Sequence, residues 1–330
     1  MLTLAGCQKA GDNKPVAVPP AAPAEPAATV IPAPQPQPPA TGMVKPVPVQ
    51  IESPSLWSDW LIYDGWKIQQ HFYSGQFRLV DGKQRLRARG SEPVCRQALA
   101  YLRWKENVRP RSRKLALLVH GLASAENIWG PMQRGLEADG YSVTSVTYPS
   151  TEQSLILHGN ILERVLLNLD PRDYDSVTII AHSLGGLVTR SALARPSFER
   201  LPVPVTGVVM LGTPNQGATL ASMLRPLARA AVTASANDLL PERAKFIGTM
   251  PKSVRFGVIA GGRGNTLGFN PVLAGDDDGI VKVEETRTDN MDDFLVLPVM
   301  HMGMAQNPTV VQATRRFLRS GSFAVRPTTR

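Results

Sequence analysis

The sequence predicts an α/β fold in which a mostly parallel sheet is covered by helices on both faces. From Arg113 onwards, short apolar runs alternate with amphipathic stretches, which is typical of β-α-β units. The first of them, residues 115–119, is a continuous apolar run, as expected of a parallel strand buried on both faces. The chain has 330 residues, 43% of them hydrophobic, enough for a core of this kind. The expected strands are 115–119, 143–146, 177–181, 205–211, 256–260 and 294–297, and the expected helices are 126–139, 152–169 and 184–194.

Composition excludes several classes of protein. Two cysteines are too few for a disulfide scaffold or a four-cysteine zinc site, and we expect neither a metal nor a cofactor. No run of 18 or more apolar residues occurs, so no transmembrane helix is predicted. The net charge of +9 is concentrated in residues 67–114, which hold thirteen basic residues and three acidic ones. Residues 115–330 are nearly neutral, which argues against a nucleic-acid-binding domain.

The first residues predict a lipid anchor. Leu4-Ala5-Gly6-Cys7 is similar to the bacterial lipobox, in which a peptidase cuts before a cysteine that carries acyl chains, so residues 1–7 would be the remnant of a lipoprotein signal. Only six residues precede Cys7, fewer than such a signal needs, so this interpretation implies a start codon upstream. It predicts a lipid-anchored protein of the bacterial cell envelope. The alternative is an unremarkable cysteine in a cytoplasmic protein.

Residues 8–50 are expected to form a disordered linker rich in proline and alanine. Twelve of the 29 prolines fall within the first 50 residues. Proline lacks the N–H that helices and sheets need, and it favours extended geometry in the residue before it. This composition suits a tether between an anchor and a folded domain. At the other end, residues 321–330 are expected to be a short tail.

Residues 51–112 predict β-hairpins followed by a helix, either part of the main domain or packed on it. The expected strands are 66–73, 76–80 and 84–89. In the last of them, Arg85, Arg87 and Arg89 alternate with apolar residues, so their side chains share one face. That face either contacts anionic lipid head groups or protects a solvated sheet edge. The basic segment 67–114 is therefore a candidate membrane-facing surface.

The most specific motif follows the expected strand at 177–181. Residues 181–186 (AHSLGG) join this strand to a helix and resemble the nucleophile elbow, G-x-S-x-G, of the α/β-hydrolases. The turn must be sharp, so the residues around the serine must be small, and Ala181 meets that need in the first glycine position. The resemblance implies an α/β-hydrolase fold with a lid insertion, and it implies Ser183 as the catalytic nucleophile.

Two further segments resemble parts of bacterial lipases and esterases of this fold. Residues 120–122 (HGL) are similar to the segment that supplies one amide of the oxyanion hole. The resemblance implies Leu122 and Leu184 as the two amide donors, and His120 and Gly121 as substrate contacts. Residues 212–217 (GTPNQG) resemble the stretch that leads into the lid, which implies Pro214 as another substrate contact.

The acid and the base are expected in the C-terminal part. Residues 275–281 (GDDDGIV) are similar to the family's acid loop, which selects Asp278 and leaves Asp276 or Asp277 as alternatives. A calcium site is the other interpretation of this acidic triplet. Residues 299–303 (VMHMG) follow the last strand, where the family keeps its histidine, which implies His301. The chain order of serine, aspartate and histidine is that of the α/β-hydrolases.

The resembling segments span about residues 113–320 and imply a serine-dependent carboxylic ester hydrolase, a lipase or esterase that forms an acyl-enzyme. The stretch 217–252 is apolar enough for a lid over the site, which favours lipid-like esters; two ordinary packing helices are the alternative. The competing functions are an acyltransferase or thioesterase with the same triad, and a non-catalytic, membrane-tethered binding protein on this scaffold.

Overall fold

The computed structural model describes residues 35–48, 56–123, 126–224, 238–244 and 247–325. Residues 36–330 form one compact unit. Cys7 and most of the expected linker lie outside the described residues, so the lipid anchor and the tether stay predictions. Among the described helices, none combines the length and the apolar character that crossing a membrane requires.

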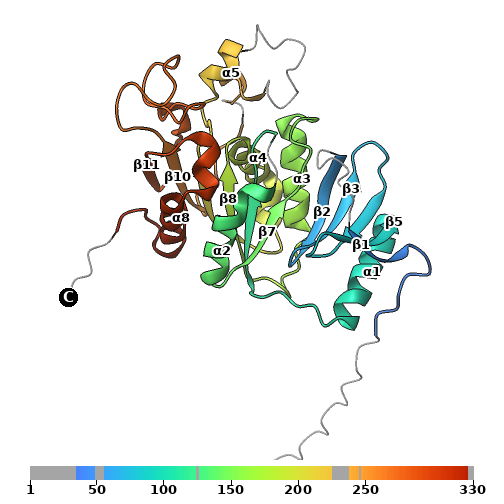
Figure 1. The fold of residues 1–330 in the computed structure, drawn as a ribbon. Coiled ribbons are helices and arrows are strands. Elements are labelled where there is room, and N and C mark those ends of the chain that lie inside the picture. Colours follow the sequence, from blue (N-terminus) through green and yellow to red (C-terminus); the bar gives the residue numbers. More distant parts are fainter. Residues whose placement is uncertain (1–34, 49–55, 124–125, 225–237, 245–246, 326–330) are drawn as a thin grey trace, which may run out of the picture. The chain divides into compact units, whose positions relative to one another are not determined.

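A parallel sheet of six strands is the main element of this unit (Figure 1). Its strands lie in the order β11-β10-β9-β8-β6-β7, and each pairs in parallel with its neighbours. The strands are β6 (Lys114–Val119), β7 (Ser142–Val146), β8 (Ser176–His182), β9 (Val205–Leu211), β10 (Arg255–Gly261) and β11 (Asp293–Leu297). The predicted strands agree with these bounds to within one residue at either end.

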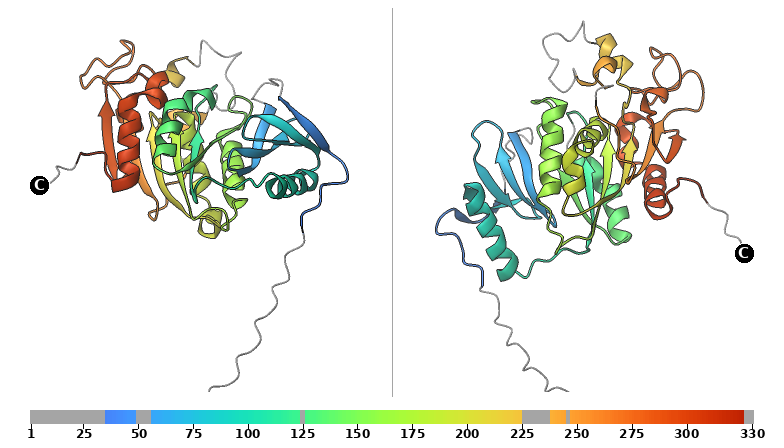
Figure 2. Two further views of the ribbon diagram at one scale, coloured as in Figure 1. Left: turned by 60° about the horizontal axis from the view of Figure 1, so that its bottom comes forward. Right: turned by 180° about the vertical axis from the view of Figure 1, so that it is seen from behind.

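Helices cover both faces of the parallel sheet (Figure 2). On β6, Leu115, Leu117 and Val119 belong to the core that includes α3 and α4, because alternate side chains of a strand point to opposite faces. Ala116 and Leu118 belong to the core that includes α2 and α8. The predicted doubly wound α/β fold is thereby confirmed. The helices of this part, with η marking a 3-10 helix, are η2 (Glu126–Trp129), α2 (Gly130–Ala138), α3 (Leu155–Leu167), α4 (Leu184–Leu193), η3 (Pro196–Arg200), α5 (Thr219–Leu224), α7 (Pro241–Ala244), η4 (Glu284–Thr286), η5 (His301–Gln306) and α8 (Pro308–Ser320).

The N-terminal part forms a second sheet, which is antiparallel and carries one helix. Its five strands lie in the order β1-β5-β4-β3-β2. They are β1 (Met43–Pro48), β2 (Trp57–Tyr63), β3 (Trp66–His71), β4 (Phe77–Val80) and β5 (Arg85–Gly90). Helix α1 (Glu92–Lys105) packs on this sheet through Cys95, Leu99 and Leu102. Hairpins and a helix are what the sequence of this part indicates.

Strand β1 changes the expected end of the linker. The sequence favours a linker up to residue 50, whereas Met43–Pro48 pair with β5 in antiparallel fashion. An edge strand tolerates Pro46 because one of its sides makes no ladder hydrogen bonds. With β1 beside it, β5 is an interior strand, so the interpretation of its arginines as protection for an exposed edge does not hold.

Arg87 does not belong to an exposed basic face. Its side chain is buried, forms ion pairs with Asp81 (3.2 Å) and Glu106, and lies over the ring of Trp66. Arg85 pairs with the same aspartate at 2.8 Å. A period of two determines which side chains share a face but not whether solvent reaches that face. Arg87 therefore cannot contact lipid head groups together with Arg85 and Arg89. A membrane contact of the wider segment 67–114 stays a prediction.

Candidate active site

Ser183 lies in a strained turn between β8 and α4. Its φ of 55° and ψ of −125° form a backbone conformation that costs a residue other than glycine about 1–3 kcal/mol. The Ser183 N–H donates to the carbonyl of Leu211 at 2.9 Å, which ties the turn to strand β9. A Cβ on Gly185 would lie 2.3 Å from the carbonyl oxygen of Val119, so only glycine permits this approach of helix and strand. The motif therefore folds as a sharp elbow.

His301 and Asp278 meet Ser183 beyond the carboxyl ends of the strands. The His301 Nε2 lies 3.0 Å from Ser183 Oγ, and His301 Nδ1 lies 2.7 Å from Asp278 Oδ2. A carboxylate can only accept, so Nδ1–H donates to Asp278 and leaves Nε2 free to accept the serine proton. The His301 N–H also donates to the carbonyl of Asp278 at 2.8 Å. The three side chains thus form one hydrogen-bonded chain in the order serine, histidine, aspartate.

The remaining Oδ1 of Asp278 is held by the loop itself. It accepts the backbone N–H groups of Ile280 at 3.0 Å and Val281 at 2.7 Å. The carboxylate is fully buried, with 1% of the residue exposed, so these bonds orient it and stabilise its charge. The sequence left the identity of the acid open among three neighbours, and Asp278 is the one that contacts His301.

The other two acids of the triplet bond to their own loops. Asp276 accepts the N–H groups of Arg263 and Gly264 at 2.7 and 2.9 Å. Asp277 Oδ1 accepts the N–H groups of Phe269, Asn270 and Gly279 at 2.7–3.2 Å, and Asp277 is fully buried. Across the described part of the chain, no group of three metal-binding side chains gathers. Asp276 and Asp277 therefore hold the loop around Asp278 in place.

The segment expected to supply the oxyanion hole lies against the elbow. A Cβ on Gly121 would be 2.9 Å from the Ser183 Cβ. His120 is buried, and its ring stacks on Tyr148, while Leu122 is half-buried. Leu184 is the first residue of α4, where an amide has no partner within its own helix. Pro214 is buried beyond the end of β9. The donor and substrate-contact roles of these residues stay predictions.

The family model of the alpha/beta hydrolases matches residues 116–322, more than half of the chain. The chain belongs to the alpha/beta hydrolase family. The match extends from strand β6 to the residues just after helix α8, so it includes the elbow, the acid loop and His301. The N-terminal sheet of this hydrolase lies outside it.

Solved structures of other proteins are similar to this hydrolase in fold. The mature form of the lipase BlEst2 from Bacillus licheniformis has 21% identity and a TM-score of 0.51, covering 64% of this chain and 92% of that one. Its propeptide form has 20% identity and a TM-score of 0.50, over 60% of this chain and 48% of that one. The phospholipase PlaB from Legionella pneumophila has 17% identity and a TM-score of 0.48, covering 61% of this chain and 56% of that one. No curated protein matches the sequence.

Gly212 makes room for the histidine and the acid of this hydrolase. Its φ is +56°, and a Cβ there would lie 3.0 Å from Asp278 Oδ2, 3.1 Å from His301 Nδ1 and 2.8 Å from Met304 Sδ. The sequence motif at 212–217 suggested a path into the lid, and it gave no sign that its first glycine adjoins the His301–Asp278 hydrogen bond. Sequence reasoning therefore missed this residue.

We expect Gly212→Ala to lower kcat by about 10-fold or more, because the new Cβ presses on the His301–Asp278 hydrogen bond and because φ is positive. Stability should fall by about 1 kcal/mol or more. Steady-state kinetics and thermal unfolding measure the two effects. Gly140→Ala is the matched control, because Gly140 also has a positive φ of 82° but nothing lies within 4 Å of its Cβ position. Equal kinetic constants in the two variants would contradict the role of Gly212.

The side chain of His182 holds the backbone of His301. Its Nε2 lies 3.0 Å from the carbonyl oxygen of His301, and the two rings are 4.8 Å apart. A carbonyl can only accept, so His182 carries its proton on Nε2. Burial, and to a lesser extent the neighbouring His301, lowers the pKa of His182 to about 3. Nothing in the elbow motif indicates a role for the His182 side chain, so sequence reasoning missed this contact.

This pKa predicts a loss of stability in acid. Above pH 6.5, His182 is neutral in both states and contributes nothing to the pH dependence. As the pH falls from 6.5 to about 3, the unfolded chain binds a proton that the folded protein does not, so unfolding becomes more favourable. At pH 5 the cost is about 2 kcal/mol. Chemical unfolding at several pH values should show a shallower pH dependence for His182→Gln, which keeps a donor for His301, than for the wild type or His71→Gln. Equal slopes would contradict this assignment.

The predicted lid of this hydrolase is only partly described. Of residues 217–252, helix α5 and helix α7 are described, whereas 225–237 and 245–246 lie outside the described residues. Gln216 and Thr219 are tied to η4: the Gln216 N–H donates to the carbonyl of Glu285 at 3.0 Å, and the Thr219 N–H donates to the Glu285 carboxylate at 2.7 Å. The start of this stretch is therefore held beside the acid loop, and its function as a lid stays a prediction.

Proposed function

We propose that this protein is a serine-dependent carboxylic ester hydrolase. The observation that carries the proposal is the hydrogen-bonded chain from Ser183 through His301 to Asp278, with the serine in a strained turn. A serine hydroxyl is a weak nucleophile until a neighbouring base accepts its proton, and a base is effective when a third group orients it. His301 provides the base, and Asp278 provides the group that orients it.

In the proposed reaction, Ser183 Oγ attacks the ester carbonyl while His301 Nε2 takes the hydroxyl proton. The N–H groups of Leu122 and Leu184 would stabilise the oxyanion of the tetrahedral intermediate. His301 then gives the proton to the leaving alcohol, and an acyl-enzyme remains on Ser183. A water molecule, activated by the same histidine, releases the acid. Asp278 keeps the proton of His301 on Nδ1 and stabilises the imidazolium.

Lipid-like esters are the proposed substrates. Met300 and Met302 flank His301 in the sequence and are 58% and 67% exposed. Exposed apolar side chains next in sequence to the proposed base support a preference for acyl chains over polar substrates. Met223, in the first part of the expected lid, is a further exposed apolar residue.

Two measurements test the proposal. A fluorophosphonate probe should label the wild-type protein at Ser183, since it reacts with activated serines. A panel of p-nitrophenyl esters of rising acyl length should show hydrolysis, with kcat/KM increasing from acetate towards medium chains. A protein that neither reacts with the probe nor cleaves any ester would refute the enzymatic function. A preference for acetate would refute only the lipid-like substrate.

A further inference from the structure

Tyr148 connects the end of strand β7 to the segment expected to form the oxyanion hole. Its hydroxyl donates to the carbonyl of His120, and the two rings stack with centroids 4.3 Å apart and planes within 11°. Burial raises the pKa of Tyr148 far above its usual value, so the hydroxyl keeps its proton and remains a donor. Tyr148 thereby fixes both the backbone and the ring of His120.

The ring of His120 in turn orients the next peptide group. Its Nδ1 lies 2.9 Å from the carbonyl oxygen of Gly121, and it must donate because a carbonyl only accepts. In a trans peptide, the C=O and the N–H of the same group point in opposite directions. Holding the Gly121 carbonyl against the His120 ring therefore turns the Leu122 N–H away from that ring. The direction of this amide therefore depends on the hydrogen bond between the His120 ring and the Gly121 carbonyl.

The chain after strand β7 also holds Ala123, the residue after Leu122. The Ala123 N–H donates to the hydroxyl of Ser150 at 3.2 Å, and Ala123 has a positive φ of 50°. Alanine adopts this conformation only when its surroundings enforce it. Residues 148 and 150 thus contact the segment on both sides of Leu122, which leaves its backbone little freedom.

The N-terminal sheet contacts the same stretch of chain after β7 through Thr147. The N–H of Asp59, on β2, donates to the carbonyl of Thr147 at 2.9 Å, and the Thr147 N–H donates to Asp59 Oδ2 at 2.8 Å. Lys67, on β3, donates to Thr147 Oγ1 at 2.8 Å and lies 3.5 Å from Asp59 Oδ2. Asp59 and Lys67 are 0% and 2% exposed. Burying two opposite charges adds little net stability, because both must lose their contact with water. Their hydrogen bonds tolerate little displacement, however, so the pair fixes the position of Thr147.

We propose that Asp59 and Tyr148 are positioning residues for the oxyanion hole, so that the N-terminal sheet helps to set the catalytic geometry. This inference rests on the proposed ester hydrolase function. Asp59 fixes the backbone of Thr147, and Tyr148 follows directly and holds His120. His120 then orients the peptide that bears the Leu122 N–H. The N-terminal sheet, which lies outside the family match, is on this view part of the catalytic apparatus.

Tyr148→Phe tests the contact between Tyr148 and His120, because it removes the hydroxyl that bonds to His120 and keeps the ring. Complete loss of one oxyanion donor lowers kcat by 10²–10³, and a misplaced donor should cost about 10-fold or more. KM should change by less than about three-fold, since the substrate's ground state needs the hole less than the transition state does. Phenylboronic acid, which forms a tetrahedral adduct on a catalytic serine, should bind more weakly in proportion to the loss of kcat.

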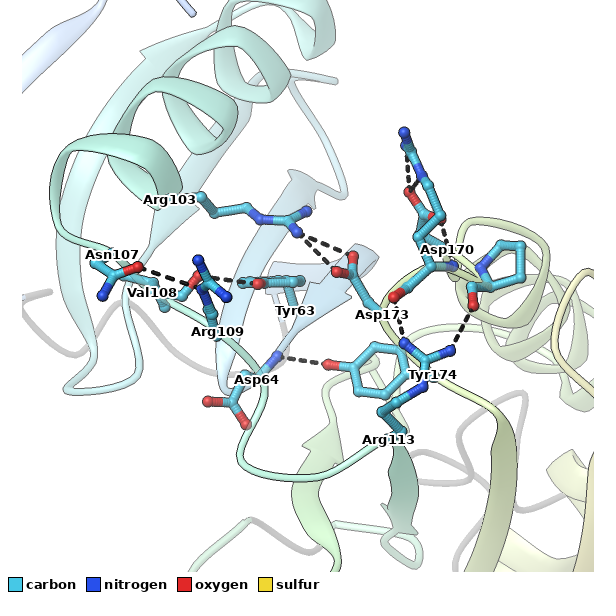
Figure 3. Close-up of polar contacts among 12 residues, drawn as sticks. Tyr63, Asp64, Arg103, Asn107, Val108, Arg109, Arg113, Asp170, Asp173 and Tyr174 are labelled. Carbon is cyan, nitrogen blue, oxygen red and sulfur yellow. Dashed lines mark hydrogen bonds and ion pairs between the residues drawn. The ribbon is translucent and has the colours of Figure 1, made fainter. Parts of the chain in front are cut away.

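Tyr174→Phe is the matched control. Tyr174 is equally buried, and its hydroxyl accepts the Asp64 N–H at 2.9 Å (Figure 3). Tyr174 is not hydrogen-bonded to residues 120–123, all of which the structure describes. Both variants should lose similar stability, and only Tyr148→Phe should lose kcat and boronate affinity. A Tyr148→Phe enzyme with kcat within about two-fold of the wild type would overturn the proposal, and so would an equal loss in Tyr174→Phe.

Asp59→Asn tests the link to the N-terminal sheet. Its control is Asp173→Asn, because Asp173 pairs with Arg103 on α1 at 2.8 Å across the same contact between the two parts of the chain (Figure 3). Asp59→Asn should lower kcat and boronate affinity together, whereas Asp173→Asn should affect stability alone. Fluorophosphonate labelling of the wild type belongs in the same series. Absent labelling would refute the enzymatic function. With normal labelling, an unchanged kcat in Tyr148→Phe would refute the positioning role, and an unchanged kcat in Asp59→Asn alone would refute the role of the N-terminal sheet.

Discussion

Replacing Ser183 with alanine should abolish ester hydrolysis and leave the fold intact. The variant removes only the hydroxyl that faces His301 Nε2 at 3.0 Å, and alanine has the same Cβ and meets the strained φ of 55° as well as serine does. Without a nucleophile, no acyl-enzyme forms, and the loss of kcat should be about 10⁴-fold or more. Fluorophosphonate labelling should disappear at the same time.

The measurement for Ser183→Ala is kcat for a p-nitrophenyl ester, together with thermal unfolding. Ser191→Ala is the matched control, because it removes a hydroxyl from the same helix, α4, about two turns from the elbow. The control should retain full activity. A Ser183→Ala protein that keeps more than a tenth of the wild-type kcat would rule out Ser183 as the nucleophile.

Replacing Asp278 with asparagine should cost about 10⁴-fold in kcat with little loss of stability. The asparagine oxygen can still accept the N–H groups of Ile280 and Val281, so the loop is preserved. Its NH₂ would face His301 Nδ1, however, and a donor there forces the ring to place its proton on Nε2. His301 could then no longer take the proton of Ser183.

Asp277→Asn is the informative comparison, because Asp277 adjoins Asp278 and is also fully buried. It supports the loop through three backbone N–H groups, which an asparagine oxygen can still accept, and it makes no bond to His301, so its replacement should cost little stability and far less kcat than Asp278→Asn. Asp276→Asn should have the smallest effect of the three. Small and equal losses of kcat in all three variants would remove Asp278 from the proposed triad.

The parallel sheet could be predicted because its signal is local. Strands buried on both faces are rich in apolar residues, so most of these strands are marked by their own residues without knowledge of their neighbours. The resemblance to the α/β-hydrolases implied Ser183, Asp278 and His301, and the parallel sheet explains why the three meet. Each comes after a parallel strand, and the carboxyl ends of parallel strands lie at one edge of the sheet. The order of the strands was not needed for that expectation.

The residue pattern alone could not distinguish Asp278 from Asp277 as the acid. Three consecutive aspartates have the same chemistry, and only the path of the loop decides which carboxylate turns towards His301. In the fold, Ile280 and Val281 bend back to bond Asp278 Oδ1 and leave its Oδ2 at 2.7 Å from the imidazole. The resemblance to a known acid loop supplied the preference that composition could not.

The sequence by itself determined the α/β class, the strands and the residues that gather at their ends, because these depend on local apolar runs and short motifs. Only the tertiary structure decided that Arg87 lies inside, that Met43–Pro48 form a strand, and that Asp59 reaches Thr147. Asp59 and Thr147 are 88 residues apart, and no local pattern marks either of them. A buried charge or an edge strand depends on its partner, and that partner becomes known only when distant segments have packed together.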